Sequence, residues 1–203
     1  MAVIEADPGF IWLKALCSAK QHRSEGENFL KTRVTIRPPT IRDWPAFQAA
    51  ARRSRGLHHP WVPTPNTRKK FAAYLKRMAS DSHRGFLVVL RESGGMVGVI
   101  NVNNIVRGSL QGAFLGYYAF APHTGQGLMR EGMLLVLKDA FQKLKLHRLE
   151  ANIQPDNRPS LRLARSCGFV REGFSRRYVK VGGRWQDHER WAILAEDRPR
   201  TSV

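Results

Sequence analysis

The sequence has little from which to build a covalent or metal-bound framework, because its 203 residues include only two cysteines. Cys17 and Cys167 lie far apart, and neither belongs to a Cys-x-x-Cys pair or to a His/Cys cluster. These absences argue against a disulfide scaffold and against a zinc site, and they are typical of proteins from a reducing compartment. We therefore expect a protein that uses no metal.

Long apolar runs are also missing. The most apolar N-terminal stretch, FIWLKALC at residues 10–17, is preceded by Glu5 and Asp7 and interrupted by Lys14. It falls short of the roughly 18 to 20 residues that a membrane span requires. We expect a cytoplasmic protein with neither a membrane segment nor a targeting signal. Apolar residues still make up 42% of the chain, which is enough for a globular core.

Acidic residues are scarce relative to basic ones. Lysine and arginine total 34 against 16 aspartates and glutamates, so the formal net charge is +18. A field of this sign favours polyanionic partners, such as RNA, a ribosome or a phosphate-rich cofactor. A basic surface that only keeps the protein in solution is the alternative, and charge alone does not decide between them.

Sequence periodicity predicts an N-terminal arm at residues 1–28, with a short helix at residues 10–20 and a polar linker after it, and one larger domain at residues 29–203. From residue 29 onward the patterns indicate a strand, two helices, three strands, a long helix, a strand, a short helix and a closing hairpin. Asp43 and Asn66 precede the first two helical stretches and are expected to cap them. Three consecutive strands with short turns favour an antiparallel meander, so the predicted fold class is α+β, with a mixed, largely antiparallel sheet flanked by helices.

The stretch TGQGLMREG at residues 124–132 lies between a strand pattern and the long helix. Gly125 and Gly127 leave the loop without bulky side chains, so the backbone N–H groups at the helix start can approach a ligand. The helix dipole favours an anion there, and a phosphate or pyrophosphate is the natural ligand. The spacing fits neither a P-loop nor a dinucleotide fingerprint, and a simple glycine turn stays open as an alternative.

A second motif follows in NRPSLRLARSCGFVREG at residues 157–173. Together the two stretches resemble the GCN5-related N-acetyltransferase (GNAT) superfamily, in which a pyrophosphate loop is followed by an Asn-x-x-Ser helix that ends in Gly-Phe-x-x-Glu-Gly. The strand GAFLGYYAF and the closing hairpin VGGRWQDHERWAIL are similar to the RimJ branch, whose members acetylate the N-terminal alanine of a small-subunit ribosomal protein. The resemblance spans about residues 29–197.

The resemblance implies that acetyl-CoA is the cosubstrate and that its acetyl group passes directly to an amine. It also implies that backbone N–H groups of one strand hold the pantetheine and polarise the thioester carbonyl. The implied residues of that strand are Tyr118, Ala119 and Phe120. The pyrophosphate is expected on the loop and helix start formed by Gly125, Gln126, Gly127, Leu128, Met129 and Arg130.

Catalytic roles are also implied by position. Asn157 is expected to cap its helix and to bond the pantetheine, and Ser160 stands where related enzymes place a hydroxyl near the sulfur. A hydroxyl that only bonds the helix backbone is the alternative for Ser160. Glu150 is the candidate base, acting through a water, although a surface glutamate is equally compatible with the sequence. Asp187 and His188 are the other candidates for the base.

The chain departs from the family pattern at Thr124 and Met129, and at Ala164, where many members carry a tyrosine that acts as general acid. In the loop LHHPWVPTPN, His58, His59 and Trp61 either line a pocket or form an exposed turn.

The acceptor is expected to be the α-amino group of a protein N-terminus, possibly of a ribosomal protein. An α-amino group with a pKa near 8 loses its proton more readily than lysine near 10.4, which matters where no strong base is visible. Two alternatives stay open. One is acetylation of a small amine such as a polyamine, an aminoglycoside or an amino acid. The other is a GNAT-fold protein that associates with RNA or the ribosome through its basic surface and has little catalysis.

Overall fold

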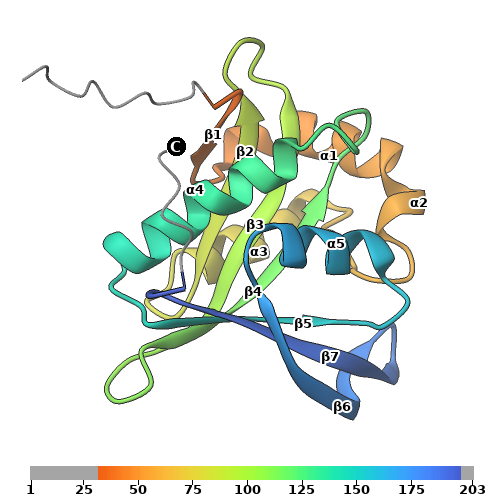
Figure 1. Ribbon diagram of the computed structural model, residues 1–203. Coiled ribbons are helices and arrows are strands. Elements are labelled where there is room, and N and C mark those ends of the chain that lie inside the picture. The colour runs from red at the N-terminus through yellow and green to blue at the C-terminus, as the bar shows by residue number, and fades with distance from the viewer. Residues whose placement is uncertain (1–31, 198–203) are drawn as a thin grey trace, which may run out of the picture. The chain divides into compact units, whose positions relative to one another are not determined.

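The structure is a computed structural model that describes residues 32–197 as a seven-stranded sheet with helices on both faces (Figure 1). The predicted N-terminal arm, including its helix at residues 10–20, lies outside the described residues, so the boundary near residue 29 stays a prediction. No helix within residues 32–197 has the length and apolarity to cross a membrane. The elements in chain order are β1 (Val34–Arg37), the 3-10 helix η1 (Ile41–Asp43), α1 (Trp44–Arg53), α2 (Arg55–His58), α3 (Arg68–Met78), β2 (Arg84–Leu90), β3 (Met96–Val106), β4 (Gly112–Ala119), α4 (Leu128–Gln142), β5 (Arg148–Ile153), α5 (Arg158–Ser166), β6 (Val170–Val181) and β7 (Arg184–Leu194).

The strands lie in the order β1-β2-β3-β4-β5-β7-β6. Strands β1 to β4 pair antiparallel with their sequence neighbours, which confirms the predicted meander, and β6 and β7 form the predicted closing hairpin. Within the described sheet only β4 and β5 pair in parallel, as expected for two strands joined through the crossover helix α4. The predicted α+β class and the mixed, largely antiparallel sheet are therefore confirmed.

Two apolar cores lie on opposite faces of the sheet. Strand β2 serves both, because Val88 faces the core under α4 and α5, whereas its neighbours Leu87 and Val89 face the core under α1 and α3. This two-sided burial explains why β2 reads as a continuous apolar run and not as an alternating pattern. Figure 1 shows α4 and α5 in front of the strands and α1 and α3 behind them.

The predicted helix caps differ from the observed ones. Asp43 lies in η1, where its carboxylate binds the Arg37 guanidinium at 2.6 and 2.9 Å and makes no cap bond to α1. Helix α3 begins one residue later than expected, so Thr67 accepts the capping bond from the Lys70 N–H in place of Asn66. The extra helix α2 occupies a stretch that carries no helical periodicity, since it is only four residues long.

Helix α4 approaches the sheet closely at Gly132. A Cβ at this position would lie 2.6 and 2.8 Å from the two methyl carbons of Val88, well inside van der Waals contact. Gly132 is thus the third glycine of the TGQGLMREG stretch, and its role is to let α4 pack on β2.

We expect Gly132→Ala to lower the free energy of unfolding by about 1 to 2 kcal/mol, because the overpacking exceeds the gain in helix propensity. Urea unfolding followed by circular dichroism would measure this. Gly56→Ala in α2 is the matched control, since no atom lies within 4 Å of its Cβ position, and it should be neutral or slightly stabilising. A Gly132→Ala variant as stable as the parent protein would contradict the close approach.

Candidate functional site

The site begins where β4 and β5 diverge. Their pairing ends at Phe114 and Glu150, so the last five residues of β4 have no partner on β5. The Phe120 N–H bonds the Val97 carbonyl at 2.7 Å. Because an antiparallel pair alternates, Tyr118 and Phe120 direct their backbone groups at β3, while those of Ala119 face the divergence.

This alternation limits which N–H groups of β4 can bond the pantetheine. Of the three N–H groups implied by the resemblance, that of Phe120 is already engaged, and that of Tyr118 points to the same neighbouring strand. Ala119 keeps an N–H toward the divergence, and Tyr117, two residues earlier, shares its direction. The pantetheine donors are therefore expected at residues 117 and 119.

The glycine loop has the geometry of an anion site. Gly125 and Gly127 have φ values of +76° and +77°, in the left-handed region that favours glycine, and Gly127 is the residue before α4. Within residues 32–197, the N–H groups of residues 125–130 have no hydrogen-bond partner. These donors and the helix dipole together suit a pyrophosphate, so the predicted role of this loop fits its shape.

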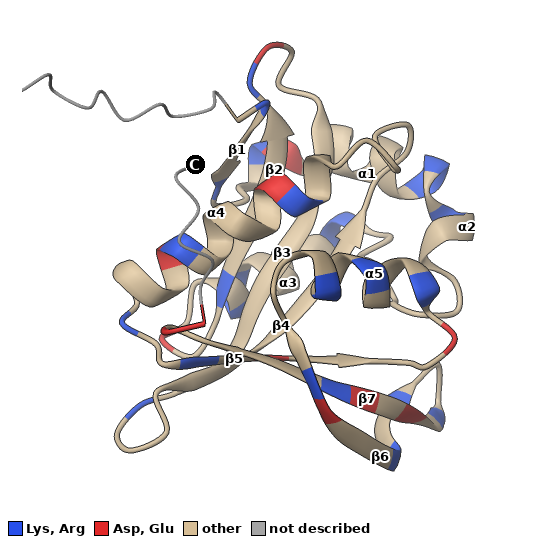
Figure 2. Cartoon of the chain, in the orientation of Figure 1, with Lys and Arg blue, Asp and Glu red and all other residues tan. Residues whose placement is uncertain are grey.

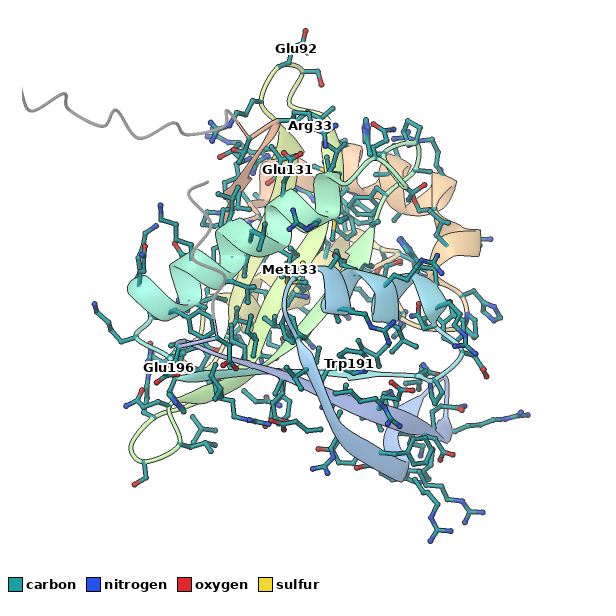
Figure 3. The ribbon with its side chains drawn as sticks, viewed as in Figure 1. Arg33, Glu92, Glu131, Met133, Trp191 and Glu196 are labelled. Atoms are coloured by element: carbon teal, nitrogen blue, oxygen red, sulfur yellow. The ribbon has the colours of Figure 1, made fainter. Side chains whose placement is uncertain are left out.

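Two contacts fasten this loop to distant parts of the chain. Glu131 accepts bonds from the Arg33 guanidinium at 2.6 and 2.8 Å and from its backbone N–H at 2.8 Å, and Arg33 also donates to the Gln126 carbonyl at 2.7 Å. Figure 3 shows Arg33 and Glu131 side by side at the start of α4. On the other side, the buried Ser54 hydroxyl accepts the Ala121 N–H at 2.9 Å. Glu131, an acidic residue in the first turn of α4, thus also anchors the loop.

Helix α5 begins as predicted. The Asn157 side chain accepts the Ser160 N–H at 3.2 Å, which confirms the cap. The Ser160 carbonyl accepts a bond from the Tyr117 hydroxyl at 3.2 Å. In the described part of the chain, the Ser160 hydroxyl has no partner, so the alternative of a backbone-bonded hydroxyl does not describe it. Its role near a sulfur stays a prediction.

Tyr117 is a residue that the sequence analysis did not single out. Burial raises the pKa of its phenol, the nearby Cys167 raises it further, and the bond to the Ser160 carbonyl opposes this shift. The phenol stays protonated at neutral pH and connects β4 to the start of α5. Ala164 is buried in the core, so the tyrosine that many family members place there has no equivalent at that position.

Glu150 takes part in an ion-pair network. One of its oxygens accepts a bond from Arg148 Nε at 2.8 Å, and the other has no partner within the described residues. Arg148 also binds the Glu172 carboxylate with both terminal nitrogens, and this bond lowers the pKa of Glu172. The glutamate of the Gly-Phe-x-x-Glu-Gly motif therefore links β6 to β5. The proposed base keeps one free oxygen.

The other two candidates for the base, Asp187 and His188, bond to the backbone of the β6–β7 hairpin. The Asp187 carboxylate accepts the Arg177 N–H at 2.7 Å, and His188 is buried with its Nδ1 3.0 Å from the Gln186 carbonyl.

Burial raises the pKa of the Cys167 thiol to about 11, so this residue is not a nucleophile at neutral pH. Among residues 32–197 no group of three His, Cys, Asp or Glu could hold a metal.

A cavity of about 830 Å³ lies beside the divergence. It is walled by the ends of α1 and α2, the loop after α2, the start of α3, the segment after β5 and the β6–β7 turn. His58, His59 and Trp61 all line it, in agreement with the pocket interpretation of that loop. Its lining includes Gln154, which follows β5, and His58, which bonds the Ala119 carbonyl of β4, so this cavity is the candidate entrance for the acceptor, hereafter the acceptor cavity.

His58 connects the acceptor cavity to β4. Its Nε2 lies 2.8 Å from the Ala119 carbonyl, which can only accept, so Nε2 carries the hydrogen. Its Nδ1 is then a buried acceptor without a partner in the described residues, and so is Asn152 Oδ1 on β5. The ring packs edge-on against Tyr118 and Phe120, at centroid distances of 5.1 and 5.8 Å. Buried acceptors of this kind suit an N–H donor from a ligand.

A comparison with family models gives a match to the acetyltransferase (GNAT) domain over residues 33–170. The probable N-acetyltransferase YjcK of Bacillus subtilis (strain 168) is 39% identical over 130 residues, which cover 64% of this chain and 72% of that protein. The ribosomal protein uS5-alanine N-acetyltransferase of Escherichia coli (strain K12) is 34% identical over 102 residues, which cover 50% of this chain and 53% of that enzyme.

Two further proteins bear on the acceptor. The spermidine N(1)-acetyltransferase of Vibrio cholerae is 30% identical over 123 residues, which cover 60% of this chain and 69% of that enzyme. Among solved structures, Mycobacterium smegmatis RimJ in complex with CoA-disulfide superimposes with a TM-score of 0.76 at 28% identity, covering 83% of this chain and 85% of that one. The chain thus resembles both ribosomal-protein and polyamine acetyltransferases.

The environment of His58 predicts a pH-dependent stability. Burial lowers its pKa, although the bond to the Ala119 carbonyl partly opposes this. Between its folded pKa and its ordinary value near 6.5, the unfolded chain therefore binds more protons than the folded one. The contribution of His58 to stability is complete above about pH 6.5 and declines as the pH falls toward the folded pKa.

We expect His58→Gln, which keeps a donor for Ala119 but cannot be protonated, to reduce the loss of unfolding free energy between pH 7 and pH 5. Burial lowers the pKa of His188 as well, so part of the slope should remain. Urea unfolding at several pH values would measure both slopes. His59→Gln at the exposed neighbour is the control and should leave the slope unchanged, whereas an unaltered slope in His58→Gln would contradict this account.

Proposed function

Because the chain belongs to the GNAT acetyltransferase family, we propose that it transfers the acetyl group of acetyl-CoA to the α-amino group at the N-terminus of a protein. The chain is an N-acetyltransferase, so the proposal concerns its acceptor. The observation that carries it is the likeness to Mycobacterium smegmatis RimJ across more than four fifths of both chains. The matching Escherichia coli enzyme, of which the alignment covers about half, is named as an alanine N-acetyltransferase of ribosomal protein uS5.

Acetyl-CoA fits the residues that are present. The unpartnered N–H groups of residues 125–130 would bind its pyrophosphate, and the free β4 edge at Tyr117 and Ala119 would bind its pantetheine. An N–H from the same edge would stabilise negative charge on the carbonyl oxygen when the amine attacks. Direct transfer requires no protein nucleophile, which agrees with the buried, protonated Cys167.

Proton transfer would be divided between two side chains. The free oxygen of Glu150 lies on β5 at the point of divergence, where it would take a proton from the incoming amine through a water. The Ser160 hydroxyl would donate a hydrogen bond to the departing thiolate. Because Tyr117 bonds the Ser160 carbonyl, it would hold this part of α5 in place.

A polyamine is the second candidate acceptor, since the Vibrio cholerae spermidine enzyme is similar in sequence. The walls of the acceptor cavity weigh against it. They carry the cations Arg52, Arg55, Lys70 and Arg184 and one carboxylate, Asp156. A multiply charged cation is repelled by such a surface. Association with RNA or a ribosome stays a prediction from the net charge.

Thiol release from acetyl-CoA, measured with the full chain, tests the function. We expect turnover with a peptide that begins with alanine, and neither with the same peptide blocked at its N-terminus nor with spermidine. Mass spectrometry would place the acetyl group on the α-amino nitrogen. Turnover with spermidine alone would establish the polyamine alternative. If the protein binds acetyl-CoA but acetylates neither acceptor, the proposal that a protein N-terminus is its acceptor is refuted.

The serine has a testable role. We expect Ser160→Ala to lower kcat about a hundredfold with little change in the KM for acetyl-CoA, because only the leaving thiolate loses its partner. Steady-state kinetics would separate the two parameters. Ser166→Ala on the same helix is the control, since its hydroxyl bonds the Leu163 carbonyl and it should retain full activity. Equal activity in Ser160→Ala would remove the hydroxyl from the mechanism.

A further inference from the structure

Four cations in the wall of the acceptor cavity have no partner in the described part of the chain. Arg52, Arg55, Lys70 and Arg184 all line this cavity of about 830 Å³. None of their side chains forms a hydrogen bond or an ion pair with another of residues 32–197. Asp156 is the one carboxylate among the described lining residues. The wall therefore has an excess of unpaired positive charge.

These cations come from separate parts of the chain. Arg52 ends α1, Arg55 begins α2, Lys70 lies in the first turn of α3, and Arg184 begins β7. Figure 2 shows basic residues at the end of α1, on α2 and on the β6–β7 hairpin. Because the fold brings the four cations to one concave surface, their electrostatic fields add. The low-dielectric walls of the cavity strengthen the positive potential inside it.

The position of these cations separates them from the coenzyme site. The donors suited to pyrophosphate are at residues 125–130, and none of those residues lines the acceptor cavity. The cavity instead contains His58, which bonds the last residue of β4, and Gln154, which directly follows β5. An anionic group held by the four cations would thus be part of the acceptor and not of the coenzyme. It would lie in the acceptor cavity while the amine of the acceptor enters the gap between β4 and β5.

We propose that the acceptor is an acidic protein N-terminus, with carboxylates in the residues directly after the first, held by Arg52, Arg55, Lys70 and Arg184. The cavity volume is in the upper part of the range for small-ligand sites, which suits several peptide residues better than a single small amine. This inference rests on the proposed function and specifies its substrate class. The charge of the wall excludes polyamines and selects among peptides.

The test compares peptides that differ only at positions two and three. With the full chain, we expect kcat/KM to fall in the order Ala-Glu-Glu, Ala-Gln-Gln, Ala-Lys-Lys, with about tenfold between the acidic and the neutral peptide. The gap should narrow as salt rises from 0.05 to about 1 M, because exposed charges are then screened. Free glutamate, assayed in parallel, distinguishes a carboxylated small amine from a peptide, and it should be a poor acceptor.

Matched variants assign the effect to the cavity. We expect Arg52→Gln, Lys70→Gln and Arg184→Gln each to lower kcat/KM for the acidic peptide roughly two- to fivefold, mainly through KM, without changing it for the neutral peptide. The controls are Arg53→Gln and Lys69→Gln, which remove an exposed cation next to a cavity residue but outside the wall. They should leave both peptides unaffected.

The outcomes are distinguishable. If the acidic and neutral peptides react equally, the charge selectivity is refuted while N-terminal acetylation stands. If no peptide reacts, the proposed function itself fails, and efficient turnover of free glutamate would replace the peptide with a small carboxylated amine. Equal losses in the cavity and control variants would mean that net charge, and not this wall, attracts the acceptor.

Discussion

The separation of β4 from β5 is the constraint on which the rest of the site depends. Each strand keeps one full partner, because β4 pairs with β3 and β5 pairs with β7 along their lengths, whereas the two pair with each other at only three positions. Within residues 32–197, the N–H groups of Tyr117 and Ala119 at the open edge of β4 then have no partner, whereas the Ala119 carbonyl bonds His58. A substrate with amide groups can satisfy them, so an interruption in the sheet becomes a binding surface.

The loop and helices around this divergence are held by long-range contacts. Arg33 and Glu131 attach the glycine loop to the segment before β1, Ser54 attaches the end of β4 to α1, and Arg130 donates to the Ser166 carbonyl at 3.0 Å. The Arg33 and Arg130 contacts hold α4, the Ser54 contact holds the end of β4, and none of them uses the N–H groups of residues 125–130. The N–H groups of residues 125–130 stay available because side chains, and not these N–H groups, hold the loop and α4 in place.

Local signals in the sequence predicted the elements and part of the site, since a cap or a glycine turn depends on residues close together in the chain. Asn157 caps α5 as predicted, and the two loop glycines lie at the start of the long helix as predicted, where both have positive φ. Contacts between distant residues left no such signal. Glu131 meets Arg33 across 98 positions and His58 meets Ala119 across 61, and no periodicity connects either pair. The one-residue shift from Asn66 to Thr67 arises where two residues able to cap a helix are adjacent, and the local sequence did not choose between them.

The net charge of +18 has more than one physical role in this fold. Arg33, Arg37 and Arg148 are paired with carboxylates, so their charge is locally compensated and they hold elements together. The cations of the acceptor cavity have no such partner among residues 32–197 and retain their field. A single figure for net charge cannot distinguish these two groups, and the sequence alone therefore suggested only a polyanionic partner, such as RNA, a ribosome or a phosphate-rich cofactor. Which cations lack a carboxylate partner, and which surface they share, is decided by the fold, and among the described residues four of them gather in the wall of the proposed acceptor cavity.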